Sequence, residues 1–216
     1  MPPRPSRNVD QLLLDAGHEL LPQTGVRGLS IRQVADHAGV NLGMFHYHFK
    51  TKNAFVRAIL DQKYNDMFAT LAPVPDREGS SLELLRAAIN VLGQWARDNR
   101  VLFVRLLGDA FGGEEVAREF LRANMPRHID IIVSLLKRAQ KDGHLKKMPV
   151  PHAIAFVIGA VSAPIMLGTA AINGGFAPPE VGAMLEEVVF TNKAISERVD
   201  MALTGMATVR KSGAKK

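Results

Sequence analysis

The chain has 216 residues, 47% of them hydrophobic and 22% charged, a balance that fits a globular protein and excludes disorder throughout. It has no cysteine, and its first ten residues, MPPRPSRNVD, hold no apolar run. We therefore expect neither disulfides nor a signal peptide, and a cytoplasmic protein. The net charge of +6 is concentrated at the ends, with +3 in residues 1–63, +4 in residues 205–216 and −1 between them, as expected if only the ends meet a polyanion.

Helical periodicity runs through almost the whole chain and strand patterns are poor, so the predicted fold class is all-α. A first helix is expected from about Asn8, which can cap it, to about Gln23, and Gly25 and Gly28 end it.

Two short helices should follow, joined by a tight turn. Ser30 is a good N-cap for the second helix, and Gly39 permits the turn. Asn41 can then cap a third helix that ends at Phe49. A helix, a short turn with glycine and a second helix form the helix-turn-helix pattern, here over about 30–49.

The rest of the chain reads as a series of longer helices. They are expected at 52–71, 81–99, 100–111, 114–142, 152–173 and about 178–204. Pro126 should break or kink the fourth of these, and the proline-rich segment 73–81 is a candidate boundary. The domains expected are 1–64, 65–206 and a basic disordered tail, 207–216.

The third helix presents an unusual outward side. At 100° per residue its apolar side chains gather on one side, which must be buried: Leu42, Phe45 and Phe49. The opposite side is uncharged and is formed by Gly43, Met44, Tyr47 and His48. His46 falls at the margin between the two. A solvated helix would carry Lys and Glu there, so this side suggests contact with something other than water.

That outward side suits the major groove of DNA. Methionine can touch a thymine methyl group, tyrosine and histidine can bond to bases or phosphates, and glycine lets the backbone come close. Lys52, at the start of the next helix, would reach a phosphate. A metal site is disfavoured because His46 and His48 diverge at i, i+2, and His46 covering the hydrophobic seam stays an alternative. No metal or cofactor is predicted.

The stretch LSIRQVADHAGVNLGMFHYHFKTKNAF, residues 29–55, resembles the DNA-binding domain of the TetR/AcrR family of bacterial regulators. Matching residues include a serine that opens the second helix, an Ala-Gly-Val turn, a glycine and aromatic pattern, and a lysine: Ser30, Val34, Ala35, Ala38, Gly39, Val40, Asn41, Gly43, Phe45, His48, Phe49 and Lys52. One departure is His46, where the family usually has tyrosine. The resemblance covers about the first sixty residues.

The resemblance implies which residues meet DNA. Those facing bases or nearby backbone would be Arg32, Gln33, Leu42, Gly43, Met44 and Tyr47. Those holding phosphates would be Ser30, His46, His48 and Lys52, with Asn41 as the helix cap in the same site. Arg4 and Arg7 could reach a minor groove, although a solvated tail is favoured for them. The implied protein is a homodimeric repressor on a palindromic DNA operator, released by a small-molecule effector.

The last two expected helices suggest where two copies meet. Residues 153–172 are apolar on every side, and the final helix carries an apolar stripe, so pairing with a twin subunit would cover both. An alternative is a membrane span, since twenty uncharged residues are long enough and Gly159 and Ala163 are spaced for membrane helix contact. Pro164 and the lack of an aromatic belt disfavour it.

The C-terminal half would also hold the effector, which the apolar candidates suggest is hydrophobic. The residues nominated to line a pocket are Asn90, Gln94, Trp95, Phe103, Phe111, Met125, His128 and Met166, with Arg105 and Asp109 as further polar anchors. Most of the large ones could equally be ordinary core. No catalytic arrangement of Ser, His and Asp is recognisable, so an enzyme with an incidental helix-turn-helix is only an alternative.

Overall fold

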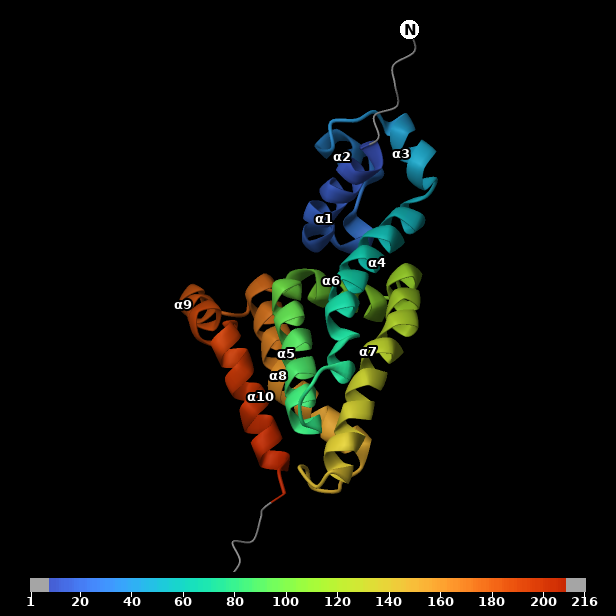
Figure 1. Cartoon of the computed structure of the whole chain (residues 1–216). Coiled ribbons are helices and arrows are strands. Elements are labelled where there is room, and N and C mark those ends of the chain that lie inside the picture. Colours follow the sequence, from blue (N-terminus) through green and yellow to red (C-terminus); the bar gives the residue numbers. More distant parts are fainter. Residues whose placement is uncertain (1–7, 209–216) are drawn as a thin grey trace, which may run out of the picture. The chain divides into compact units, whose positions relative to one another are not determined.

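The computed structural model describes residues 8–208, which are helical almost throughout (Figure 1). The helices of the described part are α1 Val9–Gly28, α2 Ile31–His37, α3 Leu42–Phe49, α4 Lys52–Leu71, α5 Ser81–Asp98, α6 Arg100–Phe111, α7 Glu115–Lys141, α8 Val150–Asn173, α9 Pro179–Met184 and α10 Asn192–Met206, with a 3-10 turn η1 Val74–Asp76 and a π-helical turn η2 Leu185–Val189. The all-α prediction is confirmed.

The chain forms two compact units, residues 1–66 with 99–125 and residues 67–98 with 126–216. In the first unit α1 packs on α2, α3 and α6. Its core includes Leu13, Phe45, Phe55 and Ile59, all fully buried. Phe55 and Ile59 are four residues apart and therefore lie on one face of α4. We call α1, α2 and α3 the head.

The turn between α2 and α3 depends on a glycine. Gly39 has φ of +66°, which side chains other than glycine rarely adopt. The amide of Val40 donates to the carbonyl of Ala35 at 3.0 Å, and that of Gly39 to Asp36 at 3.2 Å, so the last carbonyls of α2 find partners before the chain reverses. This tight stop sets the start of α3.

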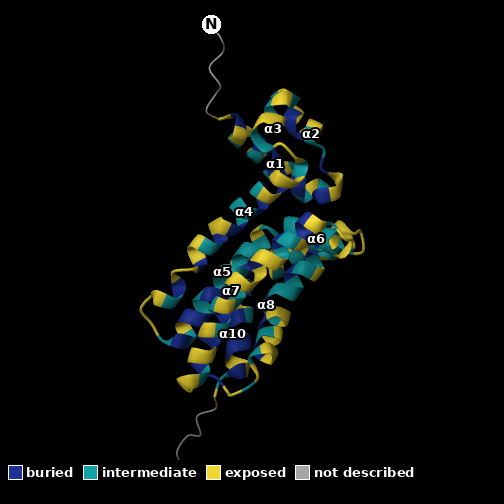
Figure 2. Ribbon diagram, turned by 90° about the vertical axis from the view of Figure 1, so that its right-hand side faces the viewer, coloured by how far each residue is buried: buried dark blue, intermediate teal, exposed yellow. Residues whose placement is uncertain are grey.

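The second unit is built on α5, α8 and α10, which pack against one another. One stripe of α8 is buried: Ala153, Val157, Val161, Ile165 and Thr169. The other sides of α8 are half-buried or exposed, and Figure 2 shows the alternation of buried and exposed residues along the helices. A helix predicted to be apolar all round is therefore covered on one side only within a single chain.

The prediction of a single final helix over about 178–204 is wrong. The segment is α9, then η2, then a separate α10. Thr191 caps the new helix, because its hydroxyl accepts from the amide of Ala194 at 3.1 Å. Phe190, just before the cap, is 3% exposed and packs on Gly168 of α8. Burying this ring turns the chain, and the capping threonine restarts the helix.

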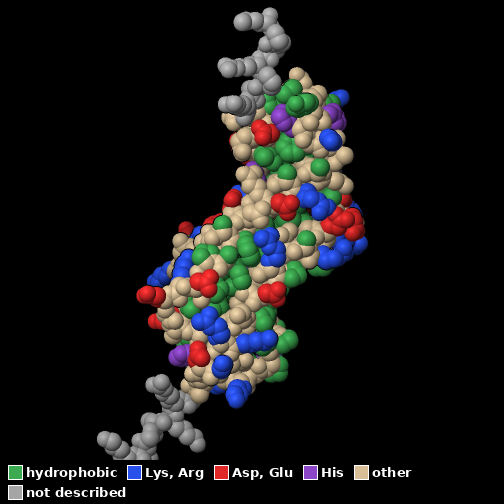
Figure 3. Space-filling model, turned by 45° about the vertical axis from the view of Figure 1, so that its right-hand side comes forward, with side chains coloured by type: hydrophobic (Ala, Val, Ile, Leu, Met, Phe, Trp, Pro, Cys, Tyr) green, Lys and Arg blue, Asp and Glu red, His purple; other side chains and the backbone are tan. Residues whose placement is uncertain are grey.

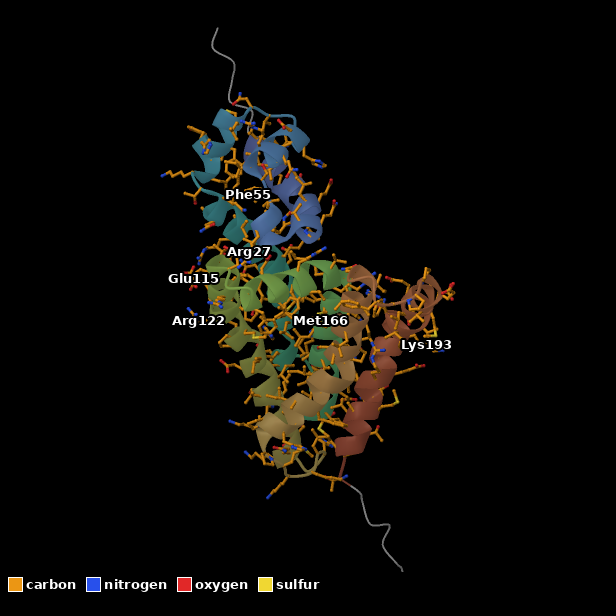
Figure 4. The ribbon with its side chains drawn as sticks, turned by 180° about the vertical axis from the view of Figure 1, so that it is seen from behind. Arg27, Phe55, Glu115, Arg122, Met166 and Lys193 are labelled. Carbon is orange, nitrogen blue, oxygen red and sulfur yellow. The ribbon has the colours of Figure 1, made fainter. Side chains whose placement is uncertain are left out.

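Pro126 does not break α7, which is continuous through it, so the predicted break is wrong, whereas a kink there stays a prediction. Proline removes one backbone donor and frees the carbonyl four residues earlier, that of Arg122. Both residues are exposed, so water can satisfy that carbonyl (Arg122 is labelled in Figure 4). Two other predicted caps, Asn8 and Ser30, occupy N-cap positions but their side chains accept no capping hydrogen bond.

Candidate nucleic-acid interface

The candidate interface is built on α3, and its local structure follows from its sequence. The side-chain oxygen of Asn41 accepts from the amide of Met44 at 3.0 Å, which confirms the predicted cap. Phe45 is 0% exposed, and its ring centroid lies 5.0 Å from that of Phe55 and 5.8 Å from that of Phe49. These aromatic contacts fix which side of α3 faces inward.

The outward side of α3 is close to the predicted one. Tyr47 is 76% exposed, and Gly43 and His46 are exposed as well. Met44 and His48 are half-buried, and the ring of His48 meets that of Tyr47 edge-on at 5.1 Å. His46 was expected at the margin, but its side chain is exposed. In Figure 3 histidine and hydrophobic side chains lie beside one another on the head.

The predicted residues of α2 lie on its outer surface. Arg32 and Gln33 are exposed, whereas Val34 and Ala35 beside them are buried. Ser30 and Leu42 are half-buried. The exposed arginine and glutamine therefore belong to the same structural unit as the exposed side of α3. Arg4 and Arg7 lie outside the described residues, as does the tail from residue 209.

Lys52 is partly engaged by the protein itself. Its ammonium donates to the backbone carbonyl of Arg27 at 3.1 Å. An ammonium has three donors, so this bond leaves two for other acceptors. A phosphate contact by Lys52 stays a prediction.

Sequence reasoning missed two exposed neighbours between α3 and α4. The hydroxyl of Thr51 accepts from the amide of Ala54 at 3.1 Å and so caps α4. Lys50 is exposed with φ of +57°. A threonine directly before an apolar periodic stretch is a cap signal that could have identified the first. No sequence pattern indicates the left-handed backbone conformation at Lys50.

The nominated effector residues have varied surroundings. Phe111 is 85% exposed and Met125 41% exposed, whereas the other six nominated residues are half-buried. Asn90 accepts from the hydroxyl of Ser196 at 2.9 Å, which joins α5 to α10. Among the further anchors, Arg105 is exposed and Asp109 bonds to the amide of Val26 at 2.6 Å. In residues 8–208 no three His, Asp or Glu side chains are grouped to hold a metal ion.

Comparison with known proteins identifies the N-terminal helices. Residues 13–59 match the model of the bacterial regulatory proteins of the tetR family. The transcriptional regulator SAB2452 of Staphylococcus aureus is 24% identical over 92 residues, which cover 43% of this chain and 50% of that protein. The transcriptional repressor KstR2 of Mycolicibacterium smegmatis is 30% identical over 84 residues, 39% of this chain and 40% of that protein. The chain thus aligns with half or less of the length of these two relatives.

The fold likeness extends further than the sequence likeness. The crystal structure of the regulator FadR of Bacillus subtilis, in complex with stearoyl-CoA, covers 91% of this chain and 98% of its own, with a TM-score of 0.63 and 15% identity. At this identity the match establishes the fold alone. It extends beyond the head into the C-terminal helices.

Proposed function

Because this chain is a TetR-family transcriptional regulator by its N-terminal domain, we propose that it is a homodimeric repressor that reads a palindromic operator through α3. The family consists of regulators rather than enzymes, so no catalytic function is proposed. The proposed place of action is the cytoplasm. The proposed division is a DNA-binding domain at 1–64 and an effector and dimerisation domain at 65–206.

The observation that carries this proposal is the exposed, uncharged side of α3. Tyr47 is 76% exposed on a helix whose Phe45, on the other side, is fully buried, so its ring and hydroxyl are available to a partner. Tyr47 and His46 offer hydrogen bonds, and Gly43 offers close backbone approach, which together suit a major groove. Arg32 and Lys50 supply positive charge beside them for phosphates.

Two copies would pair through the last helices. Outside its buried stripe, α8 carries exposed Phe156, Ile158 and Leu167, of which Leu167 is 70% exposed. Exposed Met184 and Val188 follow on α9 and η2. An apolar surface of this kind on a single chain favours association, and a symmetric dimer would cover it on both subunits.

The exposed apolar surface also keeps one alternative open. In the described part of the chain, α8 is the one helix long and apolar enough to cross a membrane. Its most apolar 18 residues have a mean hydropathy of 2.0, and 28% of them are buried. Core helices of water-soluble proteins can be equally long and apolar, so pairing of two copies is favoured over a membrane span. Replacing Leu167 with Glu should give monomers in light scattering after size exclusion. Lys137→Glu, which places a glutamate at an exposed position of α7, is the control. A wild-type chain recovered only with detergent would favour the membrane.

The effector is proposed to be a hydrophobic molecule. FadR, whose fold this chain shares, was crystallised with stearoyl-CoA, a ligand with a long apolar chain. Among the nominated residues of α5 and α8, Trp95 and Met166 are large and half-buried, as expected for the wall of an apolar site. Effector binding would favour a dimer geometry that no longer fits both half-sites.

The test is selection of bound duplexes from a random pool by the purified full chain. An enriched palindrome with half-sites about one helical turn apart is the expected result. Tyr47→Ala should reduce discrimination between operator and random duplex. Lys52→Ala should weaken binding to both and reduce the salt slope by about one, and Lys63→Ala on the same helix serves as its charge-matched control. Binding that only tracks salt, with no enriched sequence, would refute the proposal.

A further inference from the structure

The junction between α1 and α2 has an unusual backbone. Gly25 lies inside the helical run of α1 but has φ of 68° and ψ of 178°, so the helix breaks there and the chain turns toward α2. Gly25 and Val26 are nevertheless buried. An amide that leaves a helix in a buried place needs an acceptor from elsewhere in the protein.

Asp109, on the last turn of α6, supplies that acceptor. Its carboxylate accepts from the amide of Val26 at 2.6 Å, across 83 positions of sequence. A carboxylate acceptor at this distance makes a charge-assisted bond, which is stronger than a neutral one. The absence of a side chain at residue 25 makes room for it, since a Cβ there would lie 2.8 Å from the same carboxylate oxygen.

The next residue of the junction is held from two sides. The guanidinium of Arg27 donates to the carbonyl of Gly112 just after α6, and lies 3.7 Å from the carboxylate of Glu114. The carbonyl of Arg27 accepts from the ammonium of Lys52, the first residue of α4. Figure 4 labels Arg27, and Glu115 at the start of α7. The junction is therefore bonded both to the end of α6 and to the helix that follows α3.

We propose that Asp109 is a positioning residue for DNA recognition, one that fixes the head to α6 without touching DNA. This inference rests on the function proposed above. Only three residues, 28–30, separate the bonded junction from α2, so the direction in which α2 and α3 leave depends on where Val26 is held. Val26 and Asp109 both belong to the first unit, so the bond fixes the head within that unit.

The bond matters for DNA because a dimer must present two heads at one spacing. A head held firmly on α6 presents α2 and α3 in one orientation on the first unit, and a single orientation suits a single half-site spacing. A head freed from Asp109 would sample more directions, bind the best spacing more weakly and tolerate altered spacings better. A residue that only stabilised the fold would lower binding to all spacings alike.

The experiment uses the full chain, the palindrome enriched by the wild type, and versions with one base pair added or removed between the half-sites. Asp109→Ala removes the acceptor. Asp109→Asn keeps an oxygen acceptor but loses the charge. Gly25→Ala places a methyl group against the same carboxylate and also strains the backbone, because φ there is 68°. Glu115→Ala, which removes an equal charge at an exposed residue nearby, is the control.

We expect Asp109→Ala to bind the wild-type operator about tenfold more weakly and to discriminate less between the three spacings, with Asp109→Asn between it and the wild type. Gly25→Ala should behave like Asp109→Ala, and adding the two changes together should cause little further loss. Circular dichroism should report a folded protein in each case. Wild-type affinity and spacing preference in Asp109→Ala would overturn the inference, as would equal losses at every spacing. A wild type that enriches no palindrome would instead overturn the proposed function.

Discussion

Replacing Phe45 with Ala should destabilise the head while leaving the surface of α3 chemically unchanged. The ring is fully buried and meets the rings of Phe49 and Phe55, with centroids 5.8 and 5.0 Å away. Truncating a buried phenylalanine typically costs about 3–5 kcal/mol, because apolar surface is lost and a cavity remains. Whole domains are stable by only about 5–15 kcal/mol, so this one change should remove a large share of the head's stability.

The assay is urea unfolding followed by circular dichroism, with hydrogen exchange of residues 42–49 in α3 to separate the head from the second unit. Faster exchange in these residues and an early unfolding step are expected for Phe45→Ala. Tyr47→Ala is the matched control, since Tyr47 is on the same helix but 76% exposed, and its loss should change stability by less than about 0.5 kcal/mol. A cost below about 1 kcal/mol for Phe45→Ala would contradict the assignment of the inward side.

Three smaller perturbations test other parts of the structure. Asn41→Ala removes the acceptor for the amide of Met44 and should lower the free energy of unfolding in urea by about 1 kcal/mol. An unchanged midpoint would show that the Asn41 side chain does not stabilise α3. Gly17→Ala places a methyl group 2.4 Å from Cδ1 of Ile59 and 2.6 Å from Cζ of Phe55, both on α4. It should cost about 1–3 kcal/mol by overpacking, so a stabilised variant would refute that contact. The amide and hydroxyl of Ser80 hold the pKa of Glu83 below its ordinary 4.5. The ionised Glu83 carboxylate should therefore contribute its full stabilisation above pH 4.5 and lose it as the pH falls through the lowered pKa. Glu83→Gln should flatten the decline of Tm with acidity; an unchanged pH profile would count against the bond.

Much of the fold was predictable because helical periodicity and caps are local. The ends of α3 and α4 fall where the sequence predicted them, since Asn41 caps its own helix and Phe45 can be buried only on one side of an eight-residue helix. Predictions failed where a local rule met a distant partner. Thr191 restarts the last helix because Phe190 is buried against Gly168, some twenty positions earlier. Pro126 stays inside α7 because its surroundings are open to water.

The sequence by itself determined that the chain is all-α, that a helix-turn-helix lies near its N-terminus and that one side of α3 is outward and uncharged. Each follows from spacing within a few turns of one helix, which the backbone geometry alone converts into faces. Only the tertiary structure decided what Asp109 does. As sequence it was one more polar residue on a helix and a candidate anchor for an effector, whereas the fold brings its carboxylate to the amide of Val26. Hydrogen bonds between residues 83 positions apart leave no periodic trace in a sequence, because they depend on how helices cross and not on how each one forms.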